Sequence, residues 1–253
     1  MVTDANRRAY EQRYGTAVGS AEAAQIDVGL RQYMLRVYNY MGSGLLLSGI
    51  VALLVANTGA RDIFFQTSGG AVVGYTGLGL IAVFAPIGLI LAMSFGANKM
   101  QTSTVQALYW AFVALMGVGL SVALLAYTGV SVARVFFITA ISFGGLSLYG
   151  YTTKRDLSAF GTFLVMGLIG LLIAGIVNIF LQSTMLHFIY SVVGVLIFAG
   201  LTAYDTQSIK NSYFEVQGTS VEDKSAVMGA VRLYLDFINL FMFLLQFLGV
   251  RRD

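Results

Sequence analysis

The sequence predicts an all-α polytopic membrane protein, a bundle of seven transmembrane helices. Hydrophobic residues make up 57% of the 253-residue chain and charged residues only 11%, whereas a soluble domain carries about 25% charged residues. Seven apolar runs follow one another, each close to the ~20 residues that a helix needs to cross a bilayer core. Cysteine is absent, which excludes disulfides, thiolate metal sites and cysteine catalysis.

The elements follow from these runs in order. Residues 1–33 are rich in arginine and acidic residues, which predicts a cytoplasmic N-terminal tail that is partly disordered or ends in an interfacial helix at 28–36. The tail lacks the short apolar core and cleavage pattern of a signal peptide. Residues 34–253 are expected to form one seven-helix transmembrane domain. Its spans are predicted at 37–57, 72–95, 104–128, 132–151, 158–181, 186–207 and 227–249.

The basic residues predict the orientation of these spans. Of 15 lysines and arginines, ten lie in the N-terminal region or in the second–third, fourth–fifth and sixth–seventh connections. Four lie on the opposite side, namely Arg61, Arg134, Arg251 and Arg252, and Arg232 lies within the last span. Because basic loops stay on the cytoplasmic side, the N-terminus is expected in the cytoplasm and the C-terminus outside.

Two aspartates lie inside the predicted spans. Asp205 is near the end of the sixth span, and Asp236 lies about ten residues into the seventh. A carboxylate at the centre of a spanning helix costs roughly 2.5–3.5 kcal/mol, so it needs a partner, a water-filled cavity or a proton. Two carboxylates in a poorly solvated site cannot both ionise at low cost. We therefore expect the pair to lie within hydrogen-bonding distance and to hold one proton near neutral pH.

Both aspartates belong to polar stripes. In the last span the polar residues keep to one narrow helical face, and they are Arg232, Asp236, Asn239 and Gln246. In the sixth span a similar stripe contains His187, Ser191, Gly194, Thr202 and Asp205. A helix with one polar stripe turns it toward the interior of a membrane bundle, so the two stripes are expected to face each other.

Local ion pairs offer alternative explanations for the two acids. Asp205 would pair with Lys210 at the water interface, and Asp236 with Arg232 one turn earlier. His187 is the single histidine and is too isolated for a zinc site, so an interfacial or hydrogen-bonded position is expected for it.

Two sequence blocks contain the aspartates, namely FAGLTAYDTQSIK at 198–210 and LYLDFINLFMFLLQFLG at 233–249, and a third, TTKRDLSAFGTFLVMGLIG, lies at 152–170. They resemble the bacterial branch of the Bax inhibitor family, also called the transmembrane Bax inhibitor motif family. The resemblance covers nearly the whole membrane region. It implies a multi-pass protein of the bacterial inner membrane, in which six helices surround a more polar, central last helix.

The resemblance also implies a role for the aspartates. Asp205 and Asp236 would act as a pH-sensing latch on a calcium leak pathway and would bind calcium only transiently, with no resident cofactor. Relatives carry an arginine about ten residues after the second aspartate and a carboxylate in the second span. Here the first position is Gln246, and residues 72–95 contain no charge. A weaker latch is therefore expected.

Two functions follow as expectations. The first is a pH-sensitive calcium or cation leak channel gated by the two-aspartate proton latch. The alternative is a membrane-embedded regulatory protein that binds and modulates a membrane protease or a cell-death or stress partner through the tail or the 208–226 loop. An intramembrane aspartyl protease is disfavoured because the second acid lies in LYLD instead of GxGD, so no enzyme is expected. Expected partners are membrane lipid and calcium ions, and no nucleic acid.

Overall fold

The computed structural model describes residues 4–68, 71–97 and 99–252. The helices are α1 (Asp4–Asn57), α2 (Arg61–Phe64), α3 (Gly77–Gly96), α4 (Thr102–Ala126), α5 (Gly129–Thr152), α6 (Ser158–Leu181), α7 (Thr184–Val216) and α8 (Glu222–Leu248). Strands β1 (Phe65–Ser68) and β2 (Ala71–Tyr75) pair as an antiparallel hairpin. Seven of the helices are long and apolar enough to cross a membrane, which confirms the predicted seven-helix bundle.

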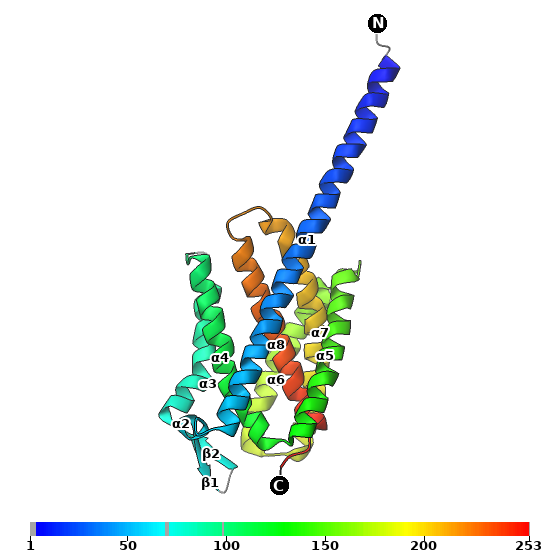
Figure 1. The fold of residues 1–253 in the computed structure, drawn as a ribbon. Helices are drawn as coiled ribbons and strands as arrows, with labels where there is room; N and C mark the ends of the chain where they lie inside the picture. Colours follow the sequence, from blue (N-terminus) through cyan, green and yellow to red (C-terminus); the bar gives the residue numbers. More distant parts are fainter. Residues whose placement is uncertain (1–3, 69–70, 98, 253) are drawn as a thin grey trace.

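Helix α8 lies at the centre of the bundle (Figure 1). It packs against α1, α4, α5 and α7, whereas α3 packs mainly on α4 and α6 on α7. Residues on all sides of α8 are buried, among them Leu233, Tyr234 and Phe237, while α6 buries only Gly161, Leu164 and Leu171. The central last helix that the family resemblance implies is therefore present, with α3 and α6 as an outer layer.

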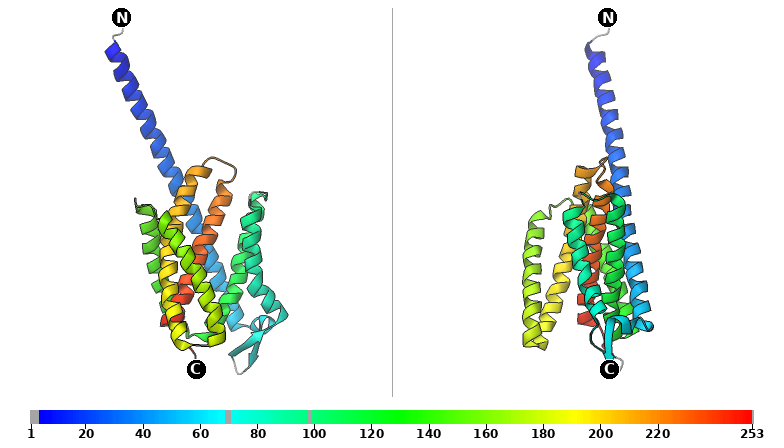
Figure 2. Two further views of the ribbon diagram at one scale, coloured as in Figure 1. Left: turned by 180° about the vertical axis from the view of Figure 1, so that it is seen from behind. Right: turned by 90° about the vertical axis from the view of Figure 1, so that its left-hand side faces the viewer.

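Helix α1 continues far beyond the bundle (Figures 1 and 2). Its 54 residues correspond to about 80 Å at 1.5 Å per residue, against a hydrocarbon core of about 30 Å. The helix runs through residues 33 and 34 without a break, so secondary structure does not mark the predicted boundary between tail and bundle. The division into these two parts stays a prediction.

Two predicted spans differ from the observed helices. The second span was placed at 72–95, but β2 ends at Tyr75 and α3 begins only after Thr76, whose side chain accepts a hydrogen bond from the Gly79 backbone N–H at 3.0 Å. The apolar run 71–75 forms a strand instead, because a short β-branched run suits either structure. Helix α7 continues to Val216, beyond the predicted residue 207, because hydropathy stops at polar residues that a helix tolerates.

Hydrogen bonds and ion pairs hold α8 at both of its ends. Near its start, Arg36 of α1 forms ion pairs with Asp223 and, at 3.8 Å, with Glu222. Beyond its end, the backbone N–H of Arg252 donates to the carbonyl of Ala126 at 3.0 Å. The N–H of Val250 donates to the Ser131 hydroxyl at 2.9 Å. The chain after α8 is thus attached to the α4–α5 connection.

A third attachment lies near the middle of α8. The Ser48 hydroxyl of α1 donates to the carbonyl of Val113 in α4 at 2.6 Å. Since a serine hydroxyl has one proton, the Tyr234 hydroxyl must donate the 2.7 Å bond that joins it to Ser48. This buried triad fixes α8 against α1 and α4 two residues before Asp236.

Candidate functional site

The structure brings Asp205 and Asp236 together at the interface of α7 and α8. These helices are antiparallel neighbours joined by residues 217–221. Asp236 is 4% exposed, and the carboxyl groups of Asp205 and Asp236 lie within hydrogen-bonding reach of each other. The proximity expected from the sequence is therefore observed, and their function stays a prediction.

One oxygen of Asp236 has no donor. Its Oδ2 is buried and receives no hydrogen bond from any group in the described part of the chain. A buried carboxylate oxygen without a donor is costly, by about 1–3 kcal/mol or more for a charged group. Two ionised carboxylates cannot bond to each other, since both only accept. A proton shared with Asp205, or a cation, would satisfy this oxygen.

Hydroxyl groups next to Asp205 connect three helices. Thr206 of α7 bonds to Ser147 of α5 at 2.9 Å, and Ser147 bonds to the Tyr38 hydroxyl of α1 at 2.5 Å. Helix α5 approaches α7 closely at Gly150, where a Cβ atom would lie 2.2 Å from the carbonyl oxygen of Ala203. Only glycine permits this approach, so α7 is fixed against α5 at the level of the aspartates.

The local ion pairs considered from the sequence are not formed among the described residues. Lys210 Nζ donates to the carbonyl of Tyr151 at 2.8 Å and lies 5.3 Å from the centre of the Tyr151 ring. Arg232 lies close enough for its charge to act on both aspartates, yet no ion pair within 4.0 Å joins it to either. The two acids are therefore paired with each other and not with a neighbouring cation.

The polar stripe of α8 was expected to face the interior of the bundle, but its residues do not all do so. Arg232 is exposed, and Asn239 donates to the carbonyl of Leu235 in its own helix at 2.8 Å. Gln246 Oε1 lies 3.4 Å from the hydroxyl oxygen of Ser191 in α7, which donates to the carbonyl of His187 at 2.9 Å, so the two stripes approach each other at a second level. Arg232 also lines a cavity together with residues of α6 and α7, and the role of the stripe stays a prediction.

His187 belongs to no candidate metal site among the described residues. It lies in the first turn of α7 and is partly buried. Among the described residues, no group of three His, Cys, Asp or Glu side chains could hold a metal ion. Calcium at Asp205 and Asp236 stays a prediction.

A polar cavity lies toward the α7–α8 connection and is lined by residues next to the aspartates in the chain. Its volume is about 260 Å³. Tyr204 adjoins Asp205 in sequence, and Arg232 precedes Asp236 by one turn. The lining residues come from α6, α7 and α8, and they are Ser158, Tyr204, Gln207, Ser208, Asn211, Ser212, Glu215 and Arg232. The cavity is large enough to hold water.

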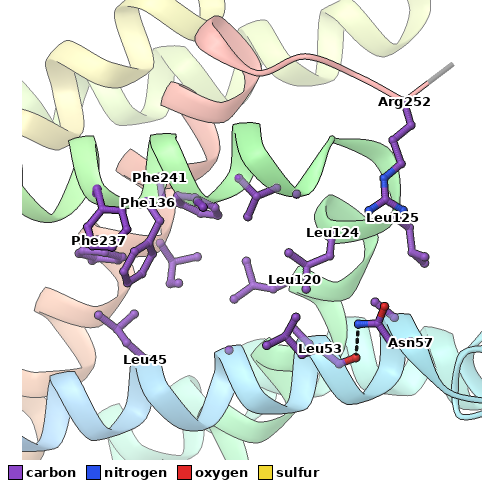
Figure 3. A pocket seen from close by; sticks show the side chains of 18 residues that line it. Leu45, Leu53, Asn57, Leu120, Leu124, Leu125, Phe136, Phe237, Phe241 and Arg252 are labelled. Atoms are coloured by element: carbon purple, nitrogen blue, oxygen red, sulfur yellow. Dashed lines mark hydrogen bonds between the residues drawn. The ribbon is translucent and has the colours of Figure 1, made fainter.

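A larger apolar cavity lies on the other side of the aspartates, between α1, α4, α5 and α8 (Figure 3). Its volume is about 510 Å³. Phe237 and Phe241, which follow Asp236 on α8, lie at one end, and Arg252 and Asn57 lie at the other (Figure 3). Asn57 donates to the carbonyl of Leu53 at 2.8 Å. The surroundings of the carboxyl pair are thus polar toward the start of α8 and apolar toward its end.

Sequence reasoning missed most of the polar cavity. Asn211, Ser212 and Glu215 were assigned to a loop at 208–226, but they lie on the continuation of α7. A usable signal was present, because Gln207, Ser208 and these three residues recur at helical spacing on one face.

Comparison with known proteins shows the family of the chain. The family model described as "Inhibitor of apoptosis-promoting Bax1" matches residues 30–253. The chain belongs to the Bax inhibitor family. The family match begins near the point where α1 enters the bundle, so the projecting part of α1 lies outside it.

Three relatives show how far the similarity extends. An uncharacterized protein of Caulobacter vibrioides is 49% identical over 90% of this chain and 92% of its own length. An uncharacterized protein of Rickettsia prowazekii is 46% identical over 94% of this chain and 98% of its own length. The inner membrane protein YbhL of Escherichia coli K12 is 41% identical over 92% of this chain and 97% of its own length. These names describe no enzymatic activity.

Proposed function

We propose that this protein is a pH-sensitive cation leak channel, permeable to calcium, and that Asp205 and Asp236 form its proton latch. The observation that carries the proposal is the buried Asp236, whose carboxyl group lies beside that of Asp205 and whose Oδ2 has no donor among the described residues. An ionisable group inside a membrane bundle is a functional-site candidate by default.

The latch would act through the bond between α7 and α8. When one proton is shared, the carboxyl pair forms a charge-assisted hydrogen bond that ties the two helices together. When the proton leaves, two like charges repel at short distance in a poorly solvated site. The ionised oxygens are also hard ligands suited to calcium, and two carboxylates make the weak, transient site that conduction needs.

The two cavities suggest which part of the pathway opens. The polar cavity beside Arg232 and Glu215 would bring cations to the carboxyl pair. The apolar cavity beside Phe237 and Phe241 would hold no continuous water. When α7 and α8 separate, water would have to pass these phenyl rings. The end of α8 would therefore act as a hydrophobic gate.

Location and orientation belong to the same proposal. The relative named as an inner membrane protein supports a place in the bacterial inner membrane. The ten-to-four distribution of basic residues supports a cytoplasmic N-terminus and an external C-terminus. Because the chain has no cysteine, single cysteines introduced at the two ends can be labelled from either side. Labelling of both ends from one side would contradict the orientation.

Ion flux through purified protein in liposomes tests the latch. We expect calcium flux to rise from about pH 6 to pH 8, and we expect Asp205→Asn and Asp236→Asn to flatten this dependence. Asp156→Asn is the matched control, because Asp156 is an exposed acid outside the helices. A pH-independent flux, or one that both Asn variants leave unchanged, would exclude the carboxyl pair as the gate.

The projection of α1 favours a second candidate function. This part of the helix lies beyond the bundle (Figure 1), where a membrane protease or a stress-related partner could bind. The 208–226 segment is less suited than expected, because α7 includes residues up to Val216. Deletion of residues 1–27 distinguishes the two functions. If the protein is a channel, the shortened chain should keep its ion flux in liposomes. If it is a regulator without ion flux, the shortened chain should no longer bind its partner.

A further inference from the structure

A third cavity combines an apolar wall with two cationic side chains. It lies between α3 and α8 at the end of the bundle near the α7–α8 connection, and its volume is about 420 Å³. Its apolar wall includes Ile90 and Met93 of α3 and Leu235 of α8, and its cations are Lys224 and Arg232. Such a surface matches a ligand that is apolar over most of its length and anionic at one end.

Both cations have N–H groups left for a ligand. Lys224 Nζ donates to the carbonyls of Ala97 at 3.2 Å and Met100 at 2.9 Å, which leaves one of its three donors. Arg232 is exposed, and its five N–H donors form no hydrogen bond or ion pair with any described residue. The two residues are eight positions apart on α8, about 12 Å along the axis, and both line the same cavity.

We propose that this cavity binds one anionic phospholipid of the bilayer, with its phosphate between Arg232 and Lys224 and an acyl chain along Ile90, Met93 and Leu235. A guanidinium offers two parallel donors that fit phosphate oxygens. Basic pockets between transmembrane helices bind lipid headgroups in this way. A free phosphate would leave the apolar wall uncovered, so the bilayer lipid is the better fit.

The bound lipid would also regulate the carboxyl pair, and this part rests on the proposed channel function. Arg232 acts by its charge on both Asp205 and Asp236. A phosphate bound to Arg232 offsets that charge and removes an attraction that favours the doubly ionised pair. Anionic lipid is therefore expected to lower the flux at a given pH, and this effect is lost in Arg232→Gln.

Native mass spectrometry of the purified full chain tests the binding without measuring flux. The probes are dioleoylphosphatidylglycerol and dioleoylphosphatidylcholine. We expect the protein to retain the anionic lipid about tenfold more strongly, about the size of one charge-assisted hydrogen bond. Arg232→Gln should lose this preference while staying folded, because the side chain is exposed and has no described partner. Arg232→Lys, which keeps the charge but not the planar fork, should give an intermediate preference.

Two further variants separate the parts of the site. Ser94→Phe fills the cavity from α3 and should reduce retention of both lipids. Arg155→Gln is the matched control, because Arg155 is exposed and lines none of the cavities described above, and it should bind like the parent protein.

Three results would overturn the proposal: equal retention of the two lipids, an unchanged preference in Arg232→Gln, or displacement of the anionic lipid by millimolar inorganic phosphate. If the lipid binds as expected but no flux is detected, the binding site stands and the channel function fails.

Discussion

The two halves of α8 differ in what surrounds them. Before Asp236, the helix contributes Lys224 and Arg232 to cavities that contain polar or cationic groups. After Asp236, it contributes Phe237 and Phe241 to a cavity that is almost entirely apolar. The carboxyl pair lies at the boundary. For the proposed channel, this difference would make access from the two sides of the membrane unequal, with charge acting on one side of the pair and dewetting on the other.

The largest effect is expected in the apolar half. Phe241 is 7% exposed and packs edge to face on Phe136 at 6.3 Å. Phe241→Ser should lower the free energy of unfolding by at least about 3 kcal/mol, and it should raise calcium flux at low pH because a polar group helps water enter the gate. Thermal unfolding and liposome flux measure the two effects.

Phe247→Ser is the matched control for this prediction. Phe247 lies on the same helix but is 44% exposed, so its replacement should change the flux little. If both variants raise the flux equally, the apolar cavity is not the gate and the contrast between the halves has no functional meaning.

A smaller effect is expected at the boundary between the halves. Tyr234→Phe removes the bond to Ser48 but leaves Ser48 bonded to the carbonyl of Val113. The free energy of unfolding should fall by about 0.5–1.5 kcal/mol. Tyr149→Phe is the control, since Tyr149 is 48% exposed and its hydroxyl has no described bond. A loss in the control as large as in Tyr234→Phe would show that the buried triad does not hold α8 in place.

The smallest effect is expected outside both halves, at the exposed Asp156 before α6. Hydrogen bonds from the hydroxyl and backbone N–H of Ser158 hold the pKa of Asp156 below its ordinary value of 3.8. A carboxyl with a lowered pKa stabilises the folded state above its unfolded pKa, and this contribution is lost as the pH falls through the folded value. Asp156→Asn should therefore be slightly less stable than the parent at neutral pH and equal to it in acid. A difference that persists in acid would contradict this assignment.

Much of the fold could be predicted because hydropathy and helical length report directly on membrane spans. The number of long helices and the meeting of Asp205 with Asp236 follow from those patterns. The strand at 71–75 was missed because a short apolar run has no distinctive period. Helical spacing shows which residues share a face, and not which neighbours cover that face, so it could not predict the different surroundings of Arg232 and Asp236. The cavities depend on packing between distant helices, which local sequence does not encode. The weaker latch expected from Gln246 stays a prediction.

The central claim is that Asp205 and Asp236 share one proton near neutral pH, and infrared difference spectroscopy of the protein in liposomes tests it most directly. A protonated carboxyl has a carbonyl band that an ionised carboxylate lacks. We predict one such band that disappears as the pH rises over the range in which calcium flux increases, and that is altered in both Asp205→Asn and Asp236→Asn. Absence of a protonated carboxyl band between about pH 6 and pH 8, or a band that both variants leave unchanged, would contradict the account.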